Sequence, residues 1–333
     1  EAPRSVPGFI VAALARRRAE GRAPFTVLSC DNLPSNGALV RGVILDFARA
    51  LGGDLADWIA AEVRFPATMV DRITPATTEE DIARLEADQG YRDPAMVVCE
   101  PFSQWVIEDD FPQGRPAWDA GGAQFVASVE AHEIMKLRCL NGTHSTLAYL
   151  GYLAGHETIA DAVSDAPFAA LLDKLWHEEI LPTVPQPEGE DLAAYCAALM
   201  TRYRNPAIRH RTWQIAMDGS QKLPQRLLGT IRDNLAAGRV PQGLCLAVAG
   251  WMRYVGGVDE RGQPIDVRDP MAERLRKACD AAEGPEAVVD ALLSIDAIFG
   301  SDLARHDGFR AAVTAWYLRL AREGARAAVS AYT

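Results

Sequence analysis

Four polar side chains stand at helical spacing in residues 130–150, a stretch whose other residues are largely apolar. They are Glu133, Lys136, Asn141 and His144. If the stretch is helical, a rotation of about 100° per residue places all four within an arc of roughly 140° on one side of the helix. The apolar residues between them can then pack into a core. The spacing therefore predicts a polar wall along one helix.

The residue types on this wall suit the oxidation of an alcohol or the reduction of a ketone. Partial burial would lower the pKa of the Lys136 amine and make it usable as a base near neutral pH. Asn141 can donate an N–H to a developing alkoxide, and His144 can donate to the same oxygen or orient it. Glu133 precedes Lys136 by three residues, so that the two side chains meet. A solvated helix face with a lone histidine would show the same pattern, and spacing alone does not choose between the two interpretations.

The surrounding sequence predicts an α/β region followed by a helical region. Residues 9–21 have helical spacing, and the apolar runs 25–30 and 95–102 are typical of buried strands. Later segments are helical one after another, separated by Pro- and Gly-rich breaks. We expect 1–128 to be the end of an α/β domain and 129–333 to be a mostly helical domain.

Composition excludes several classes of function. The net charge of −11 argues against a nucleic-acid binder, and no apolar run is long enough to predict a membrane span. The six cysteines are scattered without a C-x-x-C pair, which favours reduced thiols and a cytoplasmic location. The histidines lack the spacing of H-E-x-x-H, so we expect no metal site.

The chain contains no glycine-rich phosphate loop. A sheet that binds a dinucleotide usually carries G-x-G-x-x-G after its first strand, and the paired glycines at 52–53, 121–122 and 256–257 lack that spacing. Either no dinucleotide binds, or that part of the fold precedes Glu1. The chain does not begin with Met, which fits a piece of a longer protein.

The segment KLRCLNGTHS (136–145) is similar to the K-x-x-x-x-N-x-x-H signature of the long-chain polyol and sugar-acid dehydrogenases, the mannitol dehydrogenase family. The resemblance covers essentially the whole chain. Its later blocks are most similar to the D-mannonate oxidoreductase (fructuronate reductase) branch. The blocks that carry it are VLSCDNLPSNG (27–37), FPATMVDRITP (65–75), CEPFSQWVIEDDF (99–111), RHRTWQIAMDGSQKLPQR (209–226) and AGWMRYVGGVDERG (249–262).

The resemblance implies a set of roles for residues of the polar wall. Lys136 would be the general base that takes the hydroxyl proton or returns it. Asn32 and Asn141 would form an oxyanion-stabilising pair. His144 would orient the substrate oxygen, and Glu133 would lie beside the path by which the proton leaves.

The resemblance also implies a fold and a cofactor. The α/β part would be the remainder of a Rossmann-like dinucleotide-binding domain, without the first stretch of about 150 residues that family members carry. Family members use NAD(H), need no metal and transfer hydride directly. Asp71 would lie near the nicotinamide, and Lys222 would bind a distal hydroxyl or carboxylate of the substrate.

The sequence favours a sugar acid as the substrate. Polyol-oxidising members are expected to carry an arginine at the position of Gln214, eight residues before Lys222. Arg209 and Arg211 lie just upstream, and one of them could bind a carboxylate bidentately, although a surface location would fit equally well.

We therefore expect an NAD-dependent secondary-alcohol dehydrogenase that interconverts a keto sugar acid and its polyhydroxy acid, as in the pair fructuronate and mannonate. One alternative is a mannitol 2-dehydrogenase acting on mannitol and fructose. Another is a truncated, inactive helical domain of the family that serves only for interaction. In each enzymatic case the partner is a small molecule.

The role of Lys136 gives a first prediction. Lys136→Ala in the whole enzyme should lower turnover by about 100-fold or more, because proton transfer would lose its general base. Steady-state kinetics at saturating substrate measures this loss. A near-normal rate would remove Lys136 from the role of base.

Overall fold

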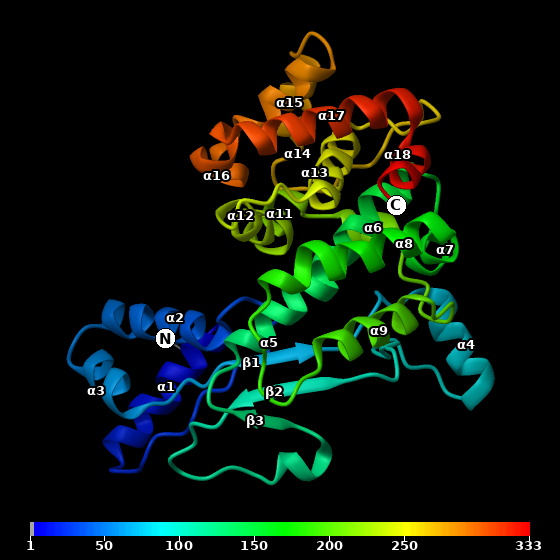
Figure 1. Ribbon diagram of the computed structural model, residues 1–333. Helices are drawn as coiled ribbons and strands as arrows, with labels where there is room; N and C mark the ends of the chain where they lie inside the picture. Colours follow the sequence, from blue (N-terminus) through cyan, green and yellow to red (C-terminus); the bar gives the residue numbers. More distant parts are fainter. Residues whose placement is uncertain (1–2) are drawn as a thin grey trace. The chain divides into compact units, whose positions relative to one another are not determined.

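The computed structural model describes residues 3–333, which divide into two compact units (Figure 1). Unit 1 runs to Ile73 and resumes over Glu100–Glu133. Unit 2 comprises Thr74–Cys99 and Ile134–Thr333. The chain thus leaves unit 1 after Ile73, returns at Glu100 and leaves it again after Glu133. The predicted division at residues 128–129 stays a prediction.

Unit 1 is an α/β unit with a three-stranded sheet in the order β1-β2-β3. Strand β1 is antiparallel to β2, with Val70 opposite Trp105, and β2 is parallel to β3, with Ile107 opposite Phe125. The elements are α1 (Val6–Ala19), α2 (Asn36–Leu51), α3 (Leu55–Glu62), β1 (Thr68–Asp71), β2 (Gln104–Glu108), the 3₁₀ turn η1 (Trp118–Gly121) and β3 (Gln124–Val126), after which α5 (Glu130–Met135) begins.

Two predicted strands are wrong. Residues 25–30 and 95–102 both lie outside the strands of the described chain, and β2 begins only at Gln104. An apolar run becomes a strand only when a neighbouring backbone pairs with it. For the first run the structure gives an isolated bond, from the Val27 N–H to the Arg64 carbonyl at 3.0 Å. Apolar composition therefore identified segments for burial, and the pairing partner decided which became strands.

A buried asparagine fixes the loop that precedes α2. The Asn36 side chain donates to the Asp31 carbonyl at 3.0 Å and to the Thr68 carbonyl at 2.9 Å, and it accepts from the Thr68 N–H at 2.9 Å. Its side chain is 1% exposed. Because both ends of one amide are used, the loop 31–35 is held at the start of β1.

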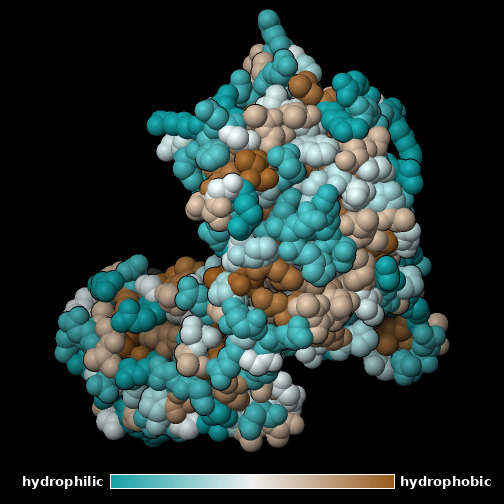
Figure 2. Space-filling model, in the orientation of Figure 1, coloured by the Kyte–Doolittle hydropathy of each residue, from teal (hydrophilic) through white to brown (hydrophobic). Residues whose placement is uncertain are grey.

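Helix α2 has one apolar face in the core and another at the surface of the unit. Its buried face contributes Ile44 and Leu45 to a cluster with residues of α1 and α3. The exposed stripe repeats every four residues and comprises Leu39, Val43, Phe47 and Leu51, which are 39–64% exposed. In Figure 2 apolar atoms are visible at the surface in the region that α1–α3 occupy in Figure 1.

Unit 2 is almost entirely helical, as the sequence predicts. None of the helices formed by residues 3–333 has the length and apolar character needed to cross a membrane. The elements of unit 2 are α4 (Glu79–Gln89), η2 (Lys136–Gly142), α6 (Thr143–Leu153), α7 (Ile159–Ser164), α8 (Ala166–Lys174), η3 (Leu175–Ile180), η4 (Leu181–Thr183), α9 (Leu192–Tyr203), α10 (Thr212–Ala216), α11 (Gly219–Leu223), η5 (Pro224–Leu228), α12 (Gly229–Ala236), α13 (Gln242–Val255), α14 (Ala272–Asp280), α15 (Pro285–Leu293), α16 (Asp296–Arg305), α17 (Asp307–Glu323) and α18 (Ala325–Tyr332).

The core of unit 2 is built around α13. This helix packs against both α6 and α17, and Trp251 within it is fully buried (Figure 1). Its N-terminus is bound by Glu179, a buried carboxylate that accepts from the N–H groups of Gly243 and Leu244 at 2.8 Å each. The same carboxylate accepts from the Tyr332 hydroxyl at 2.8 Å. One acidic side chain therefore satisfies two otherwise unpaired helix-terminal N–H groups and ties the C-terminal helix to them.

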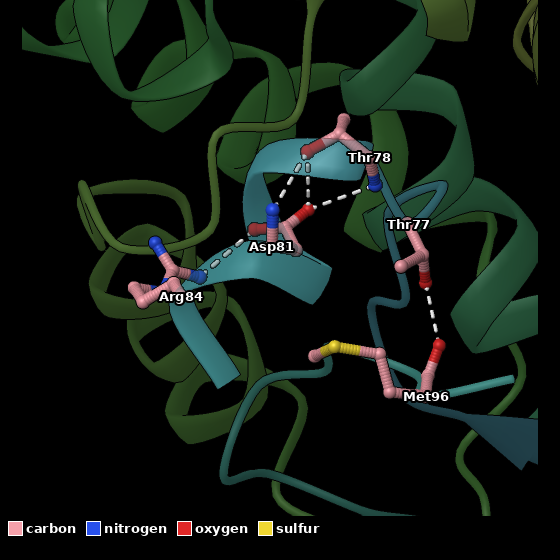
Figure 3. Close-up of polar contacts among 5 residues, drawn as sticks. All are labelled: Thr77, Thr78, Asp81, Arg84 and Met96. Carbon is pink, nitrogen blue, oxygen red and sulfur yellow. Dashed lines mark hydrogen bonds and ion pairs between the residues drawn. The ribbon is translucent and has the colours of Figure 1, made fainter. Parts of the chain in front are cut away.

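The segment 74–99 carries its own helix with a capping box (Figure 3). The Asp81 carboxylate accepts from the Thr78 N–H at 3.0 Å, while the Thr78 hydroxyl oxygen accepts from the Asp81 N–H at 3.2 Å. Arg84 donates to Asp81 at 2.8 Å, and the Thr77 hydroxyl donates to the Met96 carbonyl at 2.8 Å. These bonds fix where α4 begins and hold the returning chain beside it.

Two glycines of α2 give a matched stability test. A Cβ at Gly37 would lie 2.5 Å from the Phe65 carbonyl oxygen and 2.8 Å from the Ala67 N, whereas at Gly42 it would meet nothing within 4 Å. Gly37→Ala should therefore lower the free energy of unfolding by about 1–3 kcal/mol. Gly42→Ala should raise it by up to about 1 kcal/mol, because alanine is the better helix former. Urea denaturation followed by circular dichroism measures both, and equal effects would contradict the close approach at Gly37.

Candidate active site

The segment with the polar wall is helical, but it is not a regular α-helix. Between α5 and α6, residues Lys136–Gly142 form η2, a π-helix. A π-helix has a wider turn than an α-helix and bonds residue i to residue i+5. The predicted rotation of 100° per residue, and the arc calculated from it, are therefore wrong across these seven residues. Such segments are frequent at functional sites.

Side chains from distant helices bind carbonyls of this widened turn. The Cys139 carbonyl accepts from the Thr143 hydroxyl at 2.6 Å and from the Trp176 indole N–H at 2.9 Å. The Leu140 carbonyl accepts from the Tyr203 hydroxyl at 2.8 Å. A buried carbonyl needs a partner, so these donors stabilise the π-helical geometry. Thr143 is the first residue of the following helix α6, whereas Trp176 and Tyr203 come from η3 and α9, which local periodicity cannot reveal.

A second π-helix, η5, packs against η2 at a glycine. A Cβ at Gly142 would lie 2.8 Å from the Arg226 carbonyl oxygen. Pro224 is the first residue of η5 and has no N–H to donate to the preceding turn. The absence of a side chain at Gly142 is what allows the two segments to approach each other. The glycine that weakens the helix prediction on propensity thus has a packing role.

Three predicted site residues of unit 2 are buried on η2 and α6. Lys136 is 6% exposed, Asn141 7% and His144 6%. Buried polar side chains are uncommon unless they are paired or functional. Their burial excludes the interpretation of this stretch as a solvated helix face.

His144 lies among aromatic rings. Its ring centroid is 5.2 Å from that of Tyr203 and 4.8 Å from that of His210, which meets it edge-on at 81°. Within the described residues its Nε2 is buried and has no hydrogen-bond partner. A buried imidazole nitrogen without a partner is able to bond a substrate oxygen.

Burial and cationic neighbours keep both histidines neutral. Burial lowers the pKa of His144 well below 6.5, and the charges of Arg226 and Lys222 lower it further. The same causes lower the pKa of His210 to about 4. A neutral imidazole has one nitrogen to donate and one to accept, so His144 can bond either a hydroxyl or a ketone oxygen.

Lys222 is held by a left-handed turn at the start of α11. Asp218 has φ = 57°, and its N–H donates to the Arg268 carbonyl at 2.9 Å. Lys222 Nζ donates to the Ile215 carbonyl at 3.3 Å and is 3.8 Å from the Asp218 carboxylate. Burial, followed by the charge of Arg226, lowers the pKa of Lys222 to about 8.

Three predicted site residues belong to unit 1. Asn32 lies in the exposed loop before α2, and Asp71 is buried at the end of β1. The Glu133 carboxylate oxygens lie 3.2 and 3.3 Å from the Ser35 N–H and accept from it. The catalytic and cofactor roles of these three residues stay predictions.

The two predicted carboxylate-binding arginines have other surroundings than Lys222. Arg209 is exposed, and Arg211 lies 3.6 Å from Glu157. Arg211 lines a separate hollow of about 740 Å³ together with Trp213. His210, between them in sequence, faces His144 instead. The sequence shows a basic run here. The direction in which each side chain points depends on the backbone conformation of residues 209–211 just before α10.

Sequence reasoning missed His210, Arg226 and the donors Trp176 and Tyr203. Arg226 ends the block DGSQKLPQR, four residues after Lys222, and this helical spacing was the available signal. Among residues 3–333 no group of three or more His, Cys, Asp or Glu side chains is placed to hold a metal ion.

Two family models match the chain. The Mannitol dehydrogenase Rossmann domain matches residues 1–120, and the Mannitol dehydrogenase C-terminal domain matches residues 128–321. This chain belongs to the mannitol dehydrogenase family. The predictions of the family and of a Rossmann-like α/β part followed by a mostly helical part are confirmed.

Individual proteins of the mannitol dehydrogenase family are also similar to this chain. The chain is 52% identical to D-mannonate oxidoreductase and 52% identical to the uncharacterized oxidoreductase YdfI, both of Escherichia coli K12. Each alignment covers 99% of this chain and 68% of the relative. Mannitol 2-dehydrogenase of Pseudomonas fluorescens, solved in a ternary complex with NAD and D-mannitol, matches at 39% identity and a TM-score of 0.89, covering 99% of this chain and 66% of that one.

The chain spans about two thirds of the length of these members of the mannitol dehydrogenase family. The relatives named as enzymes are oxidoreductases, and the prediction that this chain is an oxidoreductase is confirmed at the level of the family.

The neutral histidines predict a pH dependence of stability. The pKa of His210 is about 4 in the folded protein against 6.5 ordinarily, so between these values the unfolded chain binds a proton that the folded one does not. This contribution is present above pH 6.5 and is lost as the pH falls toward 4. The stability advantage of the wild type over His210→Gln should therefore shrink across that window. Urea unfolding at several pH values measures it, and parallel curves for the two proteins would contradict the prediction.

Proposed function

We propose that this protein is an NAD-dependent oxidoreductase that interconverts a keto sugar acid and its polyhydroxy acid, as in fructuronate and mannonate. The observation that carries the proposal is the burial of Lys136, Asn141 and His144 along η2 and α6 in a chain of the mannitol dehydrogenase family.

Lys136 acts as the general base in this proposal. It removes the proton of the substrate hydroxyl when the alcohol is oxidised and returns it when the ketone is reduced. The 6% exposure of Lys136 supports this role, because a buried amine is shielded from bulk water and can contact a bound substrate hydroxyl. Glu133 and Asn32 retain the roles that the family resemblance implies, in proton release and in oxyanion stabilisation.

Asn141 and His144 bind the reacting oxygen. The amide of Asn141 donates to the oxygen as negative charge develops on it. The unpaired Nε2 of the neutral His144 supports a hydrogen bond to the same oxygen, because an uncharged ring can serve the hydroxyl and the ketone alike. The edge-on contact with His210 holds the ring in place.

Bound NAD would accept or supply the hydride. Asp71 fits the nicotinamide end, because a carboxylate accepts hydrogen bonds from a carboxamide or a ribose hydroxyl. The described part of unit 1 has no glycine-rich loop of the kind that cradles a pyrophosphate. The residues of this chain therefore fit one end of the cofactor and handle the proton and the substrate oxygen.

The sugar acid is favoured over a neutral polyol by charge. Lys222 and Arg226 lie close enough to His144 for their charges to lower its pKa, so the surroundings of His144 are cationic. A carboxylate complements such surroundings better than a hydroxyl does. The 52% identity to D-mannonate oxidoreductase supports the same choice.

A second candidate is the oxidation of mannitol to fructose. The solved relative holds D-mannitol, and its fold matches with a TM-score of 0.89. Gln214 weighs against this candidate, because polyol-oxidising members of the family are expected to carry an arginine there.

Substrate pairs that differ in the acid group test the proposal. The purified protein should reduce fructuronate with NADH and oxidise mannonate with NAD, and it should leave mannitol and fructose nearly unchanged. The absorbance of NADH follows each reaction. Activity with mannitol alone would support the second candidate.

The binding of NADH is measured separately by fluorescence. Binding without turnover of any of the four compounds would contradict both substrate assignments. The absence of NADH binding would favour the inactive interaction domain.

A further inference from the structure

Arg226 is a partly buried arginine with a single side-chain hydrogen bond in the described structure. It lies on η5, and its Nη1 donates to the Ser145 hydroxyl at 3.1 Å. Ser145 is fully buried on α6 and follows His144 in sequence. A guanidinium has five N–H groups to donate, so most of its donor capacity remains for a further partner.

The environment of Arg226 lacks a matching anion. Across residues 3–333 the structure gives this side chain no ion pair, and Ser145 is its hydrogen-bonding partner. Asp218 is 52% exposed and lies 3.8 Å from Lys222, while Asp269 accepts from the Ser220 N–H at 2.7 Å and from its hydroxyl at 2.6 Å. The nearby acids are thus solvated or already bonded.

The positive charges of Lys222 and Arg226 oppose one another. Lys222 precedes Arg226 by four residues, and the charge of Arg226 lowers the pKa of Lys222. Burial lowers the pKa of Arg226 itself. Two partly desolvated cations held close together are unfavourable unless an anion joins them. Partly buried charged side chains with shifted pKa values are typical of a binding site.

Building on the proposed function, we infer that Arg226 is the residue that binds the substrate carboxylate, with Lys222 as its partner and Ser145 orienting the guanidinium. The planar guanidinium offers two parallel N–H groups to the two carboxylate oxygens. His144, adjacent to Ser145, then binds the oxygen at the reacting end. Arg226 thereby selects acids over neutral polyols.

The two arginines expected from the sequence fit this role less well. Arg211 lies on a different hollow, 3.6 Å from Glu157, and Arg209 is exposed. Neither contributes to the lowered pKa of Lys222 or His144, whereas Arg226 contributes to both. The charge of Arg202 also lowers the pKa of His144, but of these arginines Arg226 alone lowers the pKa of both His144 and Lys222.

The test compares a sugar acid with the matching polyol in variants of Arg226. Arg226→Gln should raise the KM for mannonate by about 20-fold or more, with kcat changed by less than about 3-fold, because a carboxylate contact is made equally in the ground state and the transition state. The Ki of mannitol as a competitive inhibitor should stay the same, since mannitol has no carboxylate. Arg226→Lys should recover part of the loss, because it keeps the charge but not the bidentate geometry.

Two further variants separate binding from folding. Ser145→Ala keeps the guanidinium and removes its orienting bond, so the KM for mannonate should rise by a smaller factor. Arg84→Gln removes an exposed arginine that pairs with Asp81, and its kinetics should match the wild type. Circular dichroism and Tm are compared for all variants. If Arg226→Gln does not fold, Arg226→Lys and Ser145→Ala decide the question.

The outcomes distinguish this inference from the proposed function. A wild type that uses mannonate, with an unchanged KM in Arg226→Gln, would overturn the inference and leave the function in place. An equal loss for mannonate and mannitol would also overturn it, because the arginine would then act on the fold or on all substrates. A wild type that acts on mannitol and not on mannonate would contradict the proposed function before any variant is measured, and would overturn the inference with it.

Discussion

The widened helical turn from Lys136 to Gly142 is the constraint on which the proposed site depends. Within this turn the Cys139 and Leu140 carbonyls are bound by side chains from η3 and α9. The donors are a tryptophan and a tyrosine, both buried, so the packing of unit 2 adds to the turn's own hydrogen bonds in fixing its geometry. Lys136 and Asn141 belong to this turn, and their directions follow from its geometry.

Electrostatics in the same region depend on the exclusion of water. His144 and His210 are neutral because their burial and their cationic neighbours both disfavour protonation. Those neighbours, Lys222 and Arg226, are in turn kept near the histidines by the turn at Asp218 and by the bond to Ser145. A polar site that is rich in positive charge and poor in paired acid supports the proposal of an anionic substrate.

Unit 1 shows which elements the apolar pattern of the sequence can predict and which it cannot. Helix α1 was predictable because residues 9–21 have helical spacing. The strands were not, since a short apolar run is ambiguous until a partner strand is known. Asn36 illustrates the same dependence in a loop, because its amide is satisfied by groups from both the loop and β1.

The sequence by itself determined the family, the two kinds of fold and the positions of Lys136, Asn141, His144 and Lys222 in the chain. These follow from motifs whose residue types and spacings are local. Only the tertiary structure decided that the central turn is a π-helix, that His210 rather than its flanking arginines faces His144, and that Arg226 lacks an anionic partner. The physical reason is that each of these depends on groups from helices far apart in sequence, which supply the donors, the rings and the charges that local periodicity cannot contain.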